Sequence, residues 1–362
     1  MLNCMKLVIF GLSVSSSWGN GHATLWRGLW RALAQRGHQV IFFEHDTPWY
    51  AAHRDLVALP GGRLHLYERW DTIRGVAEGE LTDADAAIVT SYCPDGPPAA
   101  ELVLDSAVPV RAFYDLDTPI TLDRLRRGER VEYLPEHGLA EFDLVLSYTG
   151  GAALDELVQR LGARRVAPLY GSVDPERHRP AAPAAPYVSD LSYLGTYASD
   201  RQHGLIRLFV EPARQRPARR FVIGGAQYPG EFPWTRNIHF VYHVPPDDHP
   251  VFYSSSRLTL NVTRGAMASL GWCPSGRLFE AAACGVPILS DWWEGLDDFF
   301  TPGEELLVAR STAEALAALD SDDAELARIA RSARARALDC HTAAHRAREL
   351  ELALGTAVAG GV

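Results

Sequence analysis

The sequence predicts an α/β protein with two domains, each built on a parallel sheet. At 362 residues the chain is longer than one hydrophobic core usually supports. In both halves, short apolar segments alternate with helical segments, which is the pattern of parallel strands joined by helices. Between the halves, residues 178–186 contain three prolines without any periodicity. Such a segment is typical of a linker, so we place a domain boundary there.

The composition is that of an ordinary globular protein, with 47% apolar and 22% charged residues. A net charge of −10 argues against binding to nucleic acid or to an anionic membrane surface. The five cysteines are scattered and form no Cys-x-x-Cys pair, which argues against a disulfide framework or a zinc site. The apolar run at 7–12 predicts a strand, because it is short for a signal peptide or a membrane span. We expect a cytoplasmic protein without a transmembrane segment.

The chain opens with a predicted strand at 6–11, a polar loop at 12–20, a helix at 21–36 and a strand at 38–43. This order predicts a βαβ unit. Its loop follows the carboxyl end of the first strand, which is where open parallel sheets place ligands. The same alternation continues with strands at 86–91, 109–114, 143–148 and 165–170.

The polar loop ends in Asn20, Gly21 and His22, so the histidine stands at the start of a helix. From there its ring can point into a cleft and act as a general base. Two carboxylates, Asp115 and Asp117, follow a later strand. Either one could fix the tautomer of His22 and stabilise its imidazolium form. A solvated histidine and ordinary turn aspartates are the alternatives.

In the second half, Asn261 and Arg264 end a predicted strand on the same side as Ser275, so they could touch a donor or an acceptor. Trp292 and Trp293 suit stacking against a sugar, although tryptophan is more often simply buried. The strands predicted for this half are 191–195, 221–223, 238–242 and 258–262.

From residue 312 onward the chain is predicted to be helical. His341 and His345 are four residues apart, like a metal-binding pair, but a further ligand is not near them in the sequence. We therefore predict that both are surface residues of a helix. The Ala- and Gly-rich tail at 357–361 is expected to fray.

The most informative element is a helix that begins at Gly276. Ser275 is a good N-cap, and Gly285 followed by Pro287 ends the helix before a buried strand. The start of such a helix presents unpaired N–H groups and the positive end of its dipole. This combination favours a bound phosphate.

Arg277 and Glu280 are three residues apart and share one face of this helix. Arg277 could address a diphosphate with its forked donors, while Glu280 accepts hydrogen bonds from sugar hydroxyls. Together they predict a nucleotide-diphosphate site. An ordinary capped helix with a surface ion pair is the alternative.

The segment 277–287 resembles the donor-site helix of GT-B glycosyltransferases. With Ser-Gly before it and Asp-Trp-Trp-Glu-Gly-Leu after it, the segment is most similar to the CgeB-like group. Gly21-His22, followed by Gly-His-Gln-Val at 37–40, resembles the Gly-His opening of inverting GT-B enzymes, in which that histidine is the base.

The resemblance implies a GT-B architecture: two Rossmann-like domains facing each other across a cleft, with a C-terminal helix that packs back across them. We expect an N-terminal acceptor-binding domain at 1–180 and a nucleotide-sugar-binding domain at 181–340. A crossover helix and tail are expected at 341–362.

The resemblance also suggests roles for single residues. In GT-B enzymes the glutamate at the position of Glu280 holds the ribose of the nucleotide. Gly195 and Arg201 match a pattern of Gly and, six residues on, a basic residue that contacts the donor diphosphate, although the residue after Gly195 is not basic here. The turn at His243 and Val244 is where these enzymes hold the base, largely through backbone groups.

Many retaining enzymes of this fold carry a second glutamate eight residues before the ribose glutamate, and Trp272 stands there in this chain. The resemblance therefore favours inverting transfer with His22 as the base. The expected donor is a nucleotide diphosphate sugar, such as a UDP-sugar, and the acceptor a hydroxyl or an amine of unknown identity.

No cofactor and no metal are expected, because the helix start, Arg277 and Arg201 would supply the leaving-group stabilisation. Two other functions stay open. One is a non-catalytic sugar-nucleotide-binding protein of the spore-surface type. The other is an epimerase or phosphorylase with the GT-B fold.

Overall fold

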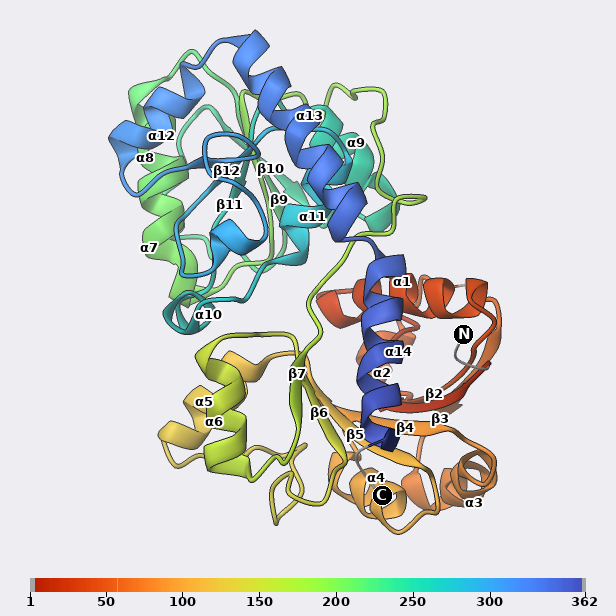
Figure 1. Ribbon diagram of the computed structural model, residues 1–362. Coiled ribbons are helices and arrows are strands. Elements are labelled where there is room, and N and C mark those ends of the chain that lie inside the picture. Colours follow the sequence, from red (N-terminus) through yellow and green to blue (C-terminus); the bar gives the residue numbers. More distant parts are fainter. Residues whose placement is uncertain (1–3, 57, 360–362) are drawn as a thin grey trace. The chain divides into compact units, whose positions relative to one another are not determined.

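The computed structural model describes residues 4–56 and 58–359 and divides into two compact units (Figure 1). The first unit contains the chain up to Tyr170 and the chain from Ala343 onward. The second unit runs from Gly171 to Thr342. We predicted domain boundaries at 180/181 and 340/341. The structure places the first boundary ten residues before the predicted one, at 170/171, and the second two residues after it, at 342/343. Gly360 and Gly361 of the predicted tail lie outside the described residues, and residues 357–359 are helical.

The proline-rich segment 178–186 is not the linker that we predicted, because it lies inside the second unit. Its backbone is tied to the end of a short helix, α9 (His249–Ser254). The N–H of Ala181 donates to Ser254 Oγ at 3.0 Å, and that of Ala184 donates to Ser255 Oγ at 2.9 Å. Prolines exclude regular structure here, but the remaining N–H groups still find partners, so the segment packs.

The sheet of the first unit is entirely parallel, with the strand order β3-β2-β1-β4-β5-β6-β7. The order reverses direction between β1 and β4, and ligands of open α/β sheets bind at such a point. The strands are β1 (Lys6–Gly11), β2 (Gln39–His45), β3 (Gly62–Tyr67), β4 (Ala86–Thr90), β5 (Val110–Asp115), β6 (Leu144–Ser147) and β7 (Val166–Pro168).

Helices cover both faces of this sheet, because successive side chains of each buried strand point to opposite faces. Val8 and Phe10 of β1 pack in one core with α3, α4 and α6, whereas Leu7 and Ile9 pack in a second core with α1 and α14. The helices of the first unit are α1 (Gly21–Gln35), α2 (Pro48–Ala51), α3 (Trp70–Leu81), α4 (Gly96–Leu104), α5 (Thr118–Arg126), α6 (Ala152–Leu161) and α14 (Ala343–Ala359).

The C-terminal helix α14 belongs to the first unit, where it packs against α1, β5 and β6 (Figure 1). Its apolar face enters the core through Ala347, Leu350 and Leu354. Glu351 on the same helix is buried and accepts hydrogen bonds from the guanidinium of Arg36 and from His38 Nε2. The chain thus returns to its first unit at its end.

The sheet of the second unit is also parallel, in the order β10-β9-β8-β11-β12-β13. Here too the order reverses, between β8 and β11. The strands are β8 (Leu191–Leu194), β9 (Phe221–Gly225), β10 (Ile238–Tyr242), β11 (Thr259–Asn261), β12 (Ile288–Ser290) and β13 (Leu307–Val308).

The helices of the second unit include α9 and a nearly continuous helical stretch from η1 to α8. Apart from α9, the helical segments of this unit are η1 (Ser199–Arg201), α7 (Gln202–Leu205), η2 (Ile206–Val210), α8 (Glu211–Gln215), η3 (Pro246–Asp248), α10 (Gly265–Leu270), α11 (Gly276–Ala283), η4 (Leu296–Asp298), α12 (Thr312–Leu319) and α13 (Asp323–Cys340). Of these, η3 follows β10, α10 and α11 follow β11, η4 follows β12, and α12 and α13 follow β13.

His341 is not the surface residue that we predicted. It follows the end of α13 and is buried, with its ring against Phe279, Phe299 and Phe300. His345 lies on α14, in the other unit. The two histidines therefore do not share a helix, because the helical pattern is interrupted at His341 and Thr342.

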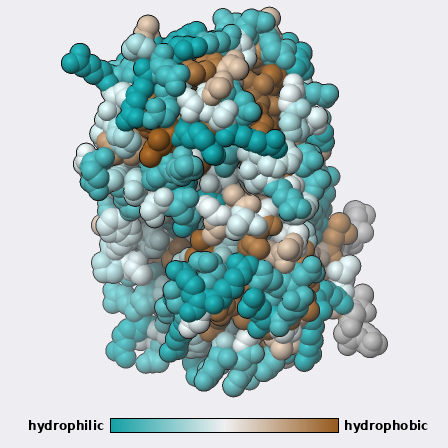
Figure 2. Space-filling model, turned by 90° about the vertical axis from the view of Figure 1, so that its left-hand side faces the viewer, coloured by the Kyte–Doolittle hydropathy of each residue, from teal (hydrophilic) through white to brown (hydrophobic). Residues whose placement is uncertain are grey.

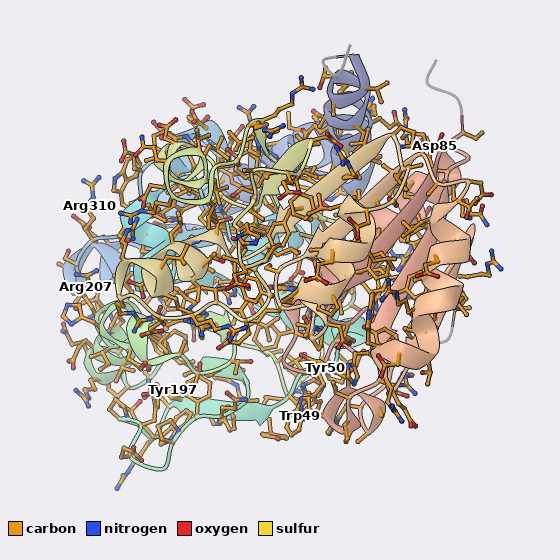
Figure 3. All side chains as sticks on the ribbon, turned by 90° about the horizontal axis from the view of Figure 1, so that it is seen from below. Trp49, Tyr50, Asp85, Tyr197, Arg207 and Arg310 are labelled. Carbon is orange, nitrogen blue, oxygen red and sulfur yellow. The ribbon has the colours of Figure 1, made fainter. Side chains whose placement is uncertain are left out.

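The face of the molecule in Figure 2 is largely hydrophilic, and its hydrophobic residues form separate patches. Large exposed aromatic residues include Trp49 on α2, whose position Figure 3 shows, and Trp292. The Trp292 ring lies 5.1 Å from the guanidinium carbon of Arg310, whereas Trp293 is buried. Hence Trp292 and Trp293 do not form a paired stacking surface. Within 4–56 and 58–359, no helix is long and apolar enough to cross a membrane.

Candidate functional site

Helix α11 begins at Gly276, as predicted, and ends at Ala283. Gly285 follows in the left-handed conformation with φ 74°, which is the stop signal expected of glycine. Ser275 occupies the N-cap position, but its hydroxyl makes no capping hydrogen bond within the described part of the chain. The predicted capping by the Ser275 side chain is therefore not present at this helix start, which lies within the described residues. The first N–H groups of the helix can instead donate hydrogen bonds to a bound anion.

Arg277 is held at the carboxyl ends of β8 and β11. Its Nε donates to the carbonyl oxygen of Leu194, and its Nη1 donates to Asn261 Oδ1 at 2.9 Å. Its guanidinium carbon lies 5.1 Å from the centre of the Tyr193 ring. Asn261, which we predicted as a ligand contact, thus positions Arg277.

Gly195 makes room for this arginine. A Cβ atom at Gly195 would lie 2.9 Å from Arg277 Nη2 and 2.8 Å from Tyr193 Oη. Both separations are shorter than van der Waals contact allows, so a side chain here would displace the guanidinium or the phenol. Glycine at this position therefore has a steric reason.

Arg201 reaches the same place from η1. Its Nη1 donates to Tyr193 Oη at 2.8 Å, and its buried Nε has no hydrogen-bond partner among the described residues. The two arginines predicted to contact a diphosphate thus meet at Tyr193. Arg264 lies apart from this hydrogen-bond pattern, because its Nε donates to Asp200 at 3.1 Å.

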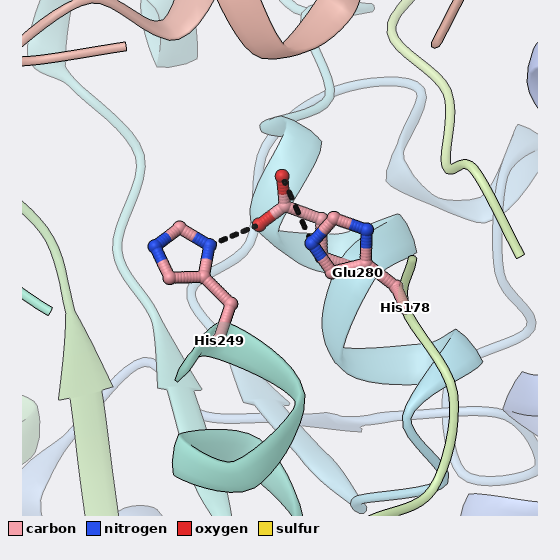
Figure 4. Close-up of side chains that lie close together, drawn as sticks. All are labelled: His178, His249 and Glu280. Atoms are coloured by element: carbon pink, nitrogen blue, oxygen red, sulfur yellow. Dashed lines mark ion pairs between the residues drawn. The ribbon is translucent and has the colours of Figure 1, made fainter. Parts of the chain in front are cut away.

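Three polar side chains lie close to the Glu280 carboxylate. Figure 4 shows two of them, His178 and His249. Tyr253 Oη donates to Glu280 Oε2 at 3.4 Å. His249 Nδ1 lies 3.8 Å from Oε2, and His178 Nε2 lies 3.9 Å from Oε1. Burial lowers the pKa of His249 although the charge of Glu280 opposes this shift, so its ring is neutral at pH 7.

The predicted base-holding turn joins this group through its backbone. His243 has a φ of 45°, and its N–H donates to the Gly225 carbonyl at 2.8 Å. Val244 is buried, and its carbonyl accepts a hydrogen bond from His249 Nε2 at 3.3 Å. The turn is therefore rigidly placed beside Glu280.

A second arrangement of functional side chains lies in the first unit. His22 Nε2 is 2.8 Å from Asp117 Oδ2, and the helix that carries His22 is capped by Asn20, whose Oδ1 accepts from His22 N at 3.0 Å. His22 Nδ1 is buried and has no hydrogen-bond partner in residues 4–56 and 58–359. The edge of the Tyr92 ring lies near the imidazole, with 5.7 Å between ring centres.

The structure separates the two aspartates that we could not rank. Asp117 contacts the imidazole, whereas Asp115 is buried behind it and accepts from the Asp117 N–H at 3.1 Å. Burial raises the pKa of Asp115 to about 6, so this carboxyl resists ionisation. Asp115 therefore supports the backbone of Asp117 and does not orient His22 directly.

The loop between β1 and α1 is held by a residue that we did not single out. Glu44 is fully buried at the end of β2 and accepts from Ser13 Oγ, Val14 N, Ser15 N and Ser15 Oγ, at 2.6 to 2.9 Å. Such a buried carboxylate is tolerated because each oxygen has donors. A glutamate directly after the apolar run Val-Ile-Phe-Phe was the available sequence signal.

Two parallel-sheet Rossmann-like domains in one chain form the GT-B architecture, and comparison with solved structures confirms this fold. The chain is similar to sucrose-phosphate synthase from Thermosynechococcus elongatus, with 15% identity, a TM-score of 0.72, and coverage of 99% of this chain and 100% of that chain. It is also similar to Anabaena HepE in complex with UDP and glucose, with 12% identity, a TM-score of 0.68, and coverage of 97% and 100%. A third similar structure is AviGT4, a glycosyltransferase involved in avilamycin A biosynthesis. It has 15% sequence identity and a TM-score of 0.58, and the match covers 99% of this chain and 99% of that chain.

Sequence comparison covers a smaller part of the chain. Residues 201–351 match the family described as glycosyl transferase-like. No curated protein sequence matches significantly. The matched segment contains Arg201, Arg277 and Glu280. It begins in the second unit and ends within α14 of the first unit.

Proposed function

We propose that the protein is a glycosyltransferase that moves a sugar from a nucleotide diphosphate sugar to an acceptor hydroxyl or amine. The observation that carries this proposal is that Arg201 and Arg277 both contact Tyr193 of β8, and that Arg277 stands at the start of α11, the helix that also carries Glu280. Two cations beside an open helix start suit a diphosphate, and a carboxylate one turn further along suits ribose hydroxyls.

The donor to test first is a UDP-sugar. Structures of Anabaena HepE hold UDP or UDP-glucose, and an alpha-glucosyltransferase of similar fold holds UDP-glucose. In this proposal Arg201, Arg277 and the first N–H groups of α11 stabilise the charge that develops on the departing diphosphate. The protein needs no metal for that task, and transfer should persist in excess EDTA. Similarity of the donor helix to the CgeB-like group remains part of the proposal.

The pair of His22 and Asp117 supports an inverting mechanism. An ionised carboxylate only accepts hydrogen bonds, so Nε2 carries the hydrogen and Nδ1 keeps its lone pair. Nδ1 takes the proton of the acceptor while the acceptor atom attacks the anomeric carbon from the face opposite the diphosphate. The bond from that carbon to the diphosphate oxygen breaks, and its electron pair leaves with the diphosphate. Asp117 stabilises the imidazolium that forms.

Trp272 gives this mechanism further support. Many retaining enzymes that the chain resembles have a glutamate eight residues before the ribose-binding glutamate. In this chain Trp272 occupies that position. Here the indole Nε1 of Trp272 donates to Asp298 Oδ2 at 2.5 Å, and its backbone N–H donates to the Glu294 carbonyl. The position thus has a structural task in this chain.

Donor turnover with product analysis tests the proposal. The purified protein is incubated with UDP-glucose and other UDP-sugars and a panel of hydroxyl and amine acceptors, and NMR reads the anomeric configuration of the product. A glycosyltransferase of the proposed kind gives an inverted product and free UDP. Tight nucleotide affinity without turnover would instead identify a binding protein, and a changed sugar on an intact donor would identify an epimerase.

A further inference from the structure

The side chains of His178, His249 and Glu280 form a cluster that the proposed reaction does not require, which we term the His–Glu cluster. One nitrogen or oxygen from each residue lies within 4.8 Å of the others. Among the residues that the structure describes, it is the one group of at least three His, Cys, Asp or Glu side chains with this property. Figure 4 shows both imidazoles facing the carboxylate.

The hydrogen-bond pattern of His249 leaves the right nitrogen free for a cation. Its Nε2 donates to the Val244 carbonyl, so the lone pair is on Nδ1, the atom that faces Glu280 Oε2 at 3.8 Å. A histidine that donates one N–H to a backbone carbonyl and presents the other nitrogen is the usual arrangement of a metal ligand. The backbone of the turn thus orients the ring.

His178 supplies a second, independent observation. Its side chain is 6% exposed, and neither ring nitrogen has a hydrogen-bond partner in the described part of the chain. Burying an imidazole without partners costs free energy that a ligand at Nε2 would recover. Glu280 Oε1 lies 3.9 Å from His178 Nε2, which is too long for a hydrogen bond.

The donor set and its spacing select the kind of cation. Two imidazole nitrogens and one carboxylate oxygen suit zinc, whereas calcium and magnesium prefer oxygen ligands. Tetrahedral zinc with bonds of about 2.0 to 2.1 Å holds its ligand atoms about 3.4 Å apart. The separations of 3.8 and 3.9 Å run to different oxygens of Glu280, and one ligand atom from each of the three residues lies within 4.8 Å of the others. The side chains must therefore rotate to close on one ion. Three protein ligands leave a fourth position open.

We infer that the His–Glu cluster binds a divalent cation of the zinc class and that the bound cation excludes the donor nucleotide. The second part rests on the proposed function, in which Glu280 accepts hydrogen bonds from the ribose. When one carboxylate oxygen binds the cation, only the other is left for the two ribose hydroxyls, and its negative charge is shared with the cation. The cation would therefore inhibit an enzyme whose chemistry does not require it.

Zinc binding is tested first, without nucleotide, on protein freed of any affinity tag. Calorimetry with ZnCl₂ should show one site, and His178→Ala and His249→Ala should each weaken it by more than the roughly 10- to 100-fold that loss of an outer partner costs. The matched control is His239→Ala, which removes an exposed histidine of the same unit and should leave zinc affinity unchanged. Equal affinity in all three variants, or no binding by the wild type, would overturn the site.

Cobalt gives a readout that needs no variant. Co²⁺ in a four- or five-coordinate site absorbs visible light strongly, whereas Co²⁺ held loosely with six oxygen ligands absorbs weakly. A strong band that one equivalent of Zn²⁺ abolishes supports the cluster as the site. A weak spectrum like that of the aqueous ion contradicts it, even if an alanine variant fails to fold.

Competition is then tested with a ribonucleoside, because it has the ribose but no phosphate to chelate zinc. The nucleoside that binds the zinc-free protein most tightly is titrated with and without saturating ZnCl₂. Its affinity should fall at least tenfold in the wild type and change little in His249→Ala. Unchanged affinity in the wild type overturns the competition. If nucleosides and UDP fail to bind even without zinc, the proposed donor site is wrong, while the zinc titration still decides the metal site.

Discussion

In the proposed donor site, Glu280 is the residue that would contact the ribose, and its neighbours bear on that role. Tyr253 Oη donates to its carboxylate, which restricts the rotation of that group, and two histidines lie within 4 Å of its oxygens. An acceptor held in this way loses little conformational entropy when a ribose arrives. The carboxylate is 14% exposed, so a ligand can still reach it.

Replacing Glu280 by glutamine should weaken UDP binding about five- to a hundredfold, which corresponds to about 1 to 3 kcal/mol. The amide keeps the shape of the side chain but loses the charge that strengthens hydrogen bonds from ribose hydroxyls. Calorimetry with UDP measures the change. Glu304→Gln, at an exposed glutamate of the same unit, is the control and should bind like the wild type. Equal affinity of the two variants would refute the ribose contact.

His22→Ala should lower turnover by about 10² to 10⁴ while the affinity for UDP stays nearly unchanged, because the base touches the acceptor and not the nucleotide. Asp117→Asn should also lower turnover, since an amide can donate to Nε2 and so stabilise the wrong tautomer. Steady-state rates and calorimetry separate the two effects. His137→Ala, at an exposed histidine, is the control. A retained anomeric configuration in the product would contradict the mechanism even if His22 proved essential.

The approach of β8 to α11 gives a prediction for two elements together. Gly195→Ala should displace Arg277 or Tyr193 and weaken UDP binding by tenfold or more, because a hydrogen bond to a charged group contributes about 1.5 to 3 kcal/mol. Uridine should bind almost as before, since it has no diphosphate. Gly230→Ala is the control, because a Cβ there meets no atom within 4 Å. Loss of uridine and UDP binding in equal measure would show a general disruption of the site instead.

Elements with continuous apolar runs could be predicted from the sequence. The strand at 6–11 has the predicted bounds, and so has the strand at 238–242, although His239 interrupts the apolar residues of the latter. β3 could not be predicted, because this edge strand carries Arg63 and His65 among its apolar residues. Nor could β13, whose two residues are too short for any periodicity.

Residues of the proposed donor site could be singled out from the sequence because Arg277 and Glu280 lie on one helix, α11, and Gly195 directly follows one strand, β8. The remaining site residues could not, because folding brings them together from distant segments. His178 lies in a segment without periodicity, and His249 opens a short helix after two prolines. Neither has a sequence signal of proximity to Glu280. The choice between Asp115 and Asp117 likewise depends on which carboxylate faces the imidazole, and only the fold decides that.

For the whole molecule, Glu351 links the end of the chain to its beginning. Its hydrogen bonds with Arg36 lower the pKa of this carboxyl to about 2, and the bond from His38 adds to the shift. The folded-state pKa is below the ordinary value of 4.5, so this group stabilises the fold above pH 4.5. That stability is lost as the pH falls from 4.5 toward 2.

Glu351→Gln should therefore reduce the free energy of unfolding of the first unit by about 1 to 3 kcal/mol at pH 7. The difference from the wild type should narrow as the pH falls below 4.5. Urea unfolding at a series of pH values measures both effects, with Glu101→Gln, at an exposed glutamate, as the control. A difference that is the same at pH 7 and at pH 3.5 would contradict an ionic origin.

The return of α14 to the first unit has a consequence for synthesis on the ribosome. Translation delivers the strands of the first sheet before residues 171–342 and delivers α14 only after them. During that interval the apolar face that Ala347, Leu350 and Leu354 later cover is without its final layer. The first unit therefore cannot complete its fold until the second unit has been synthesised, and its uncovered apolar face is accessible to chaperones and proteases during that interval.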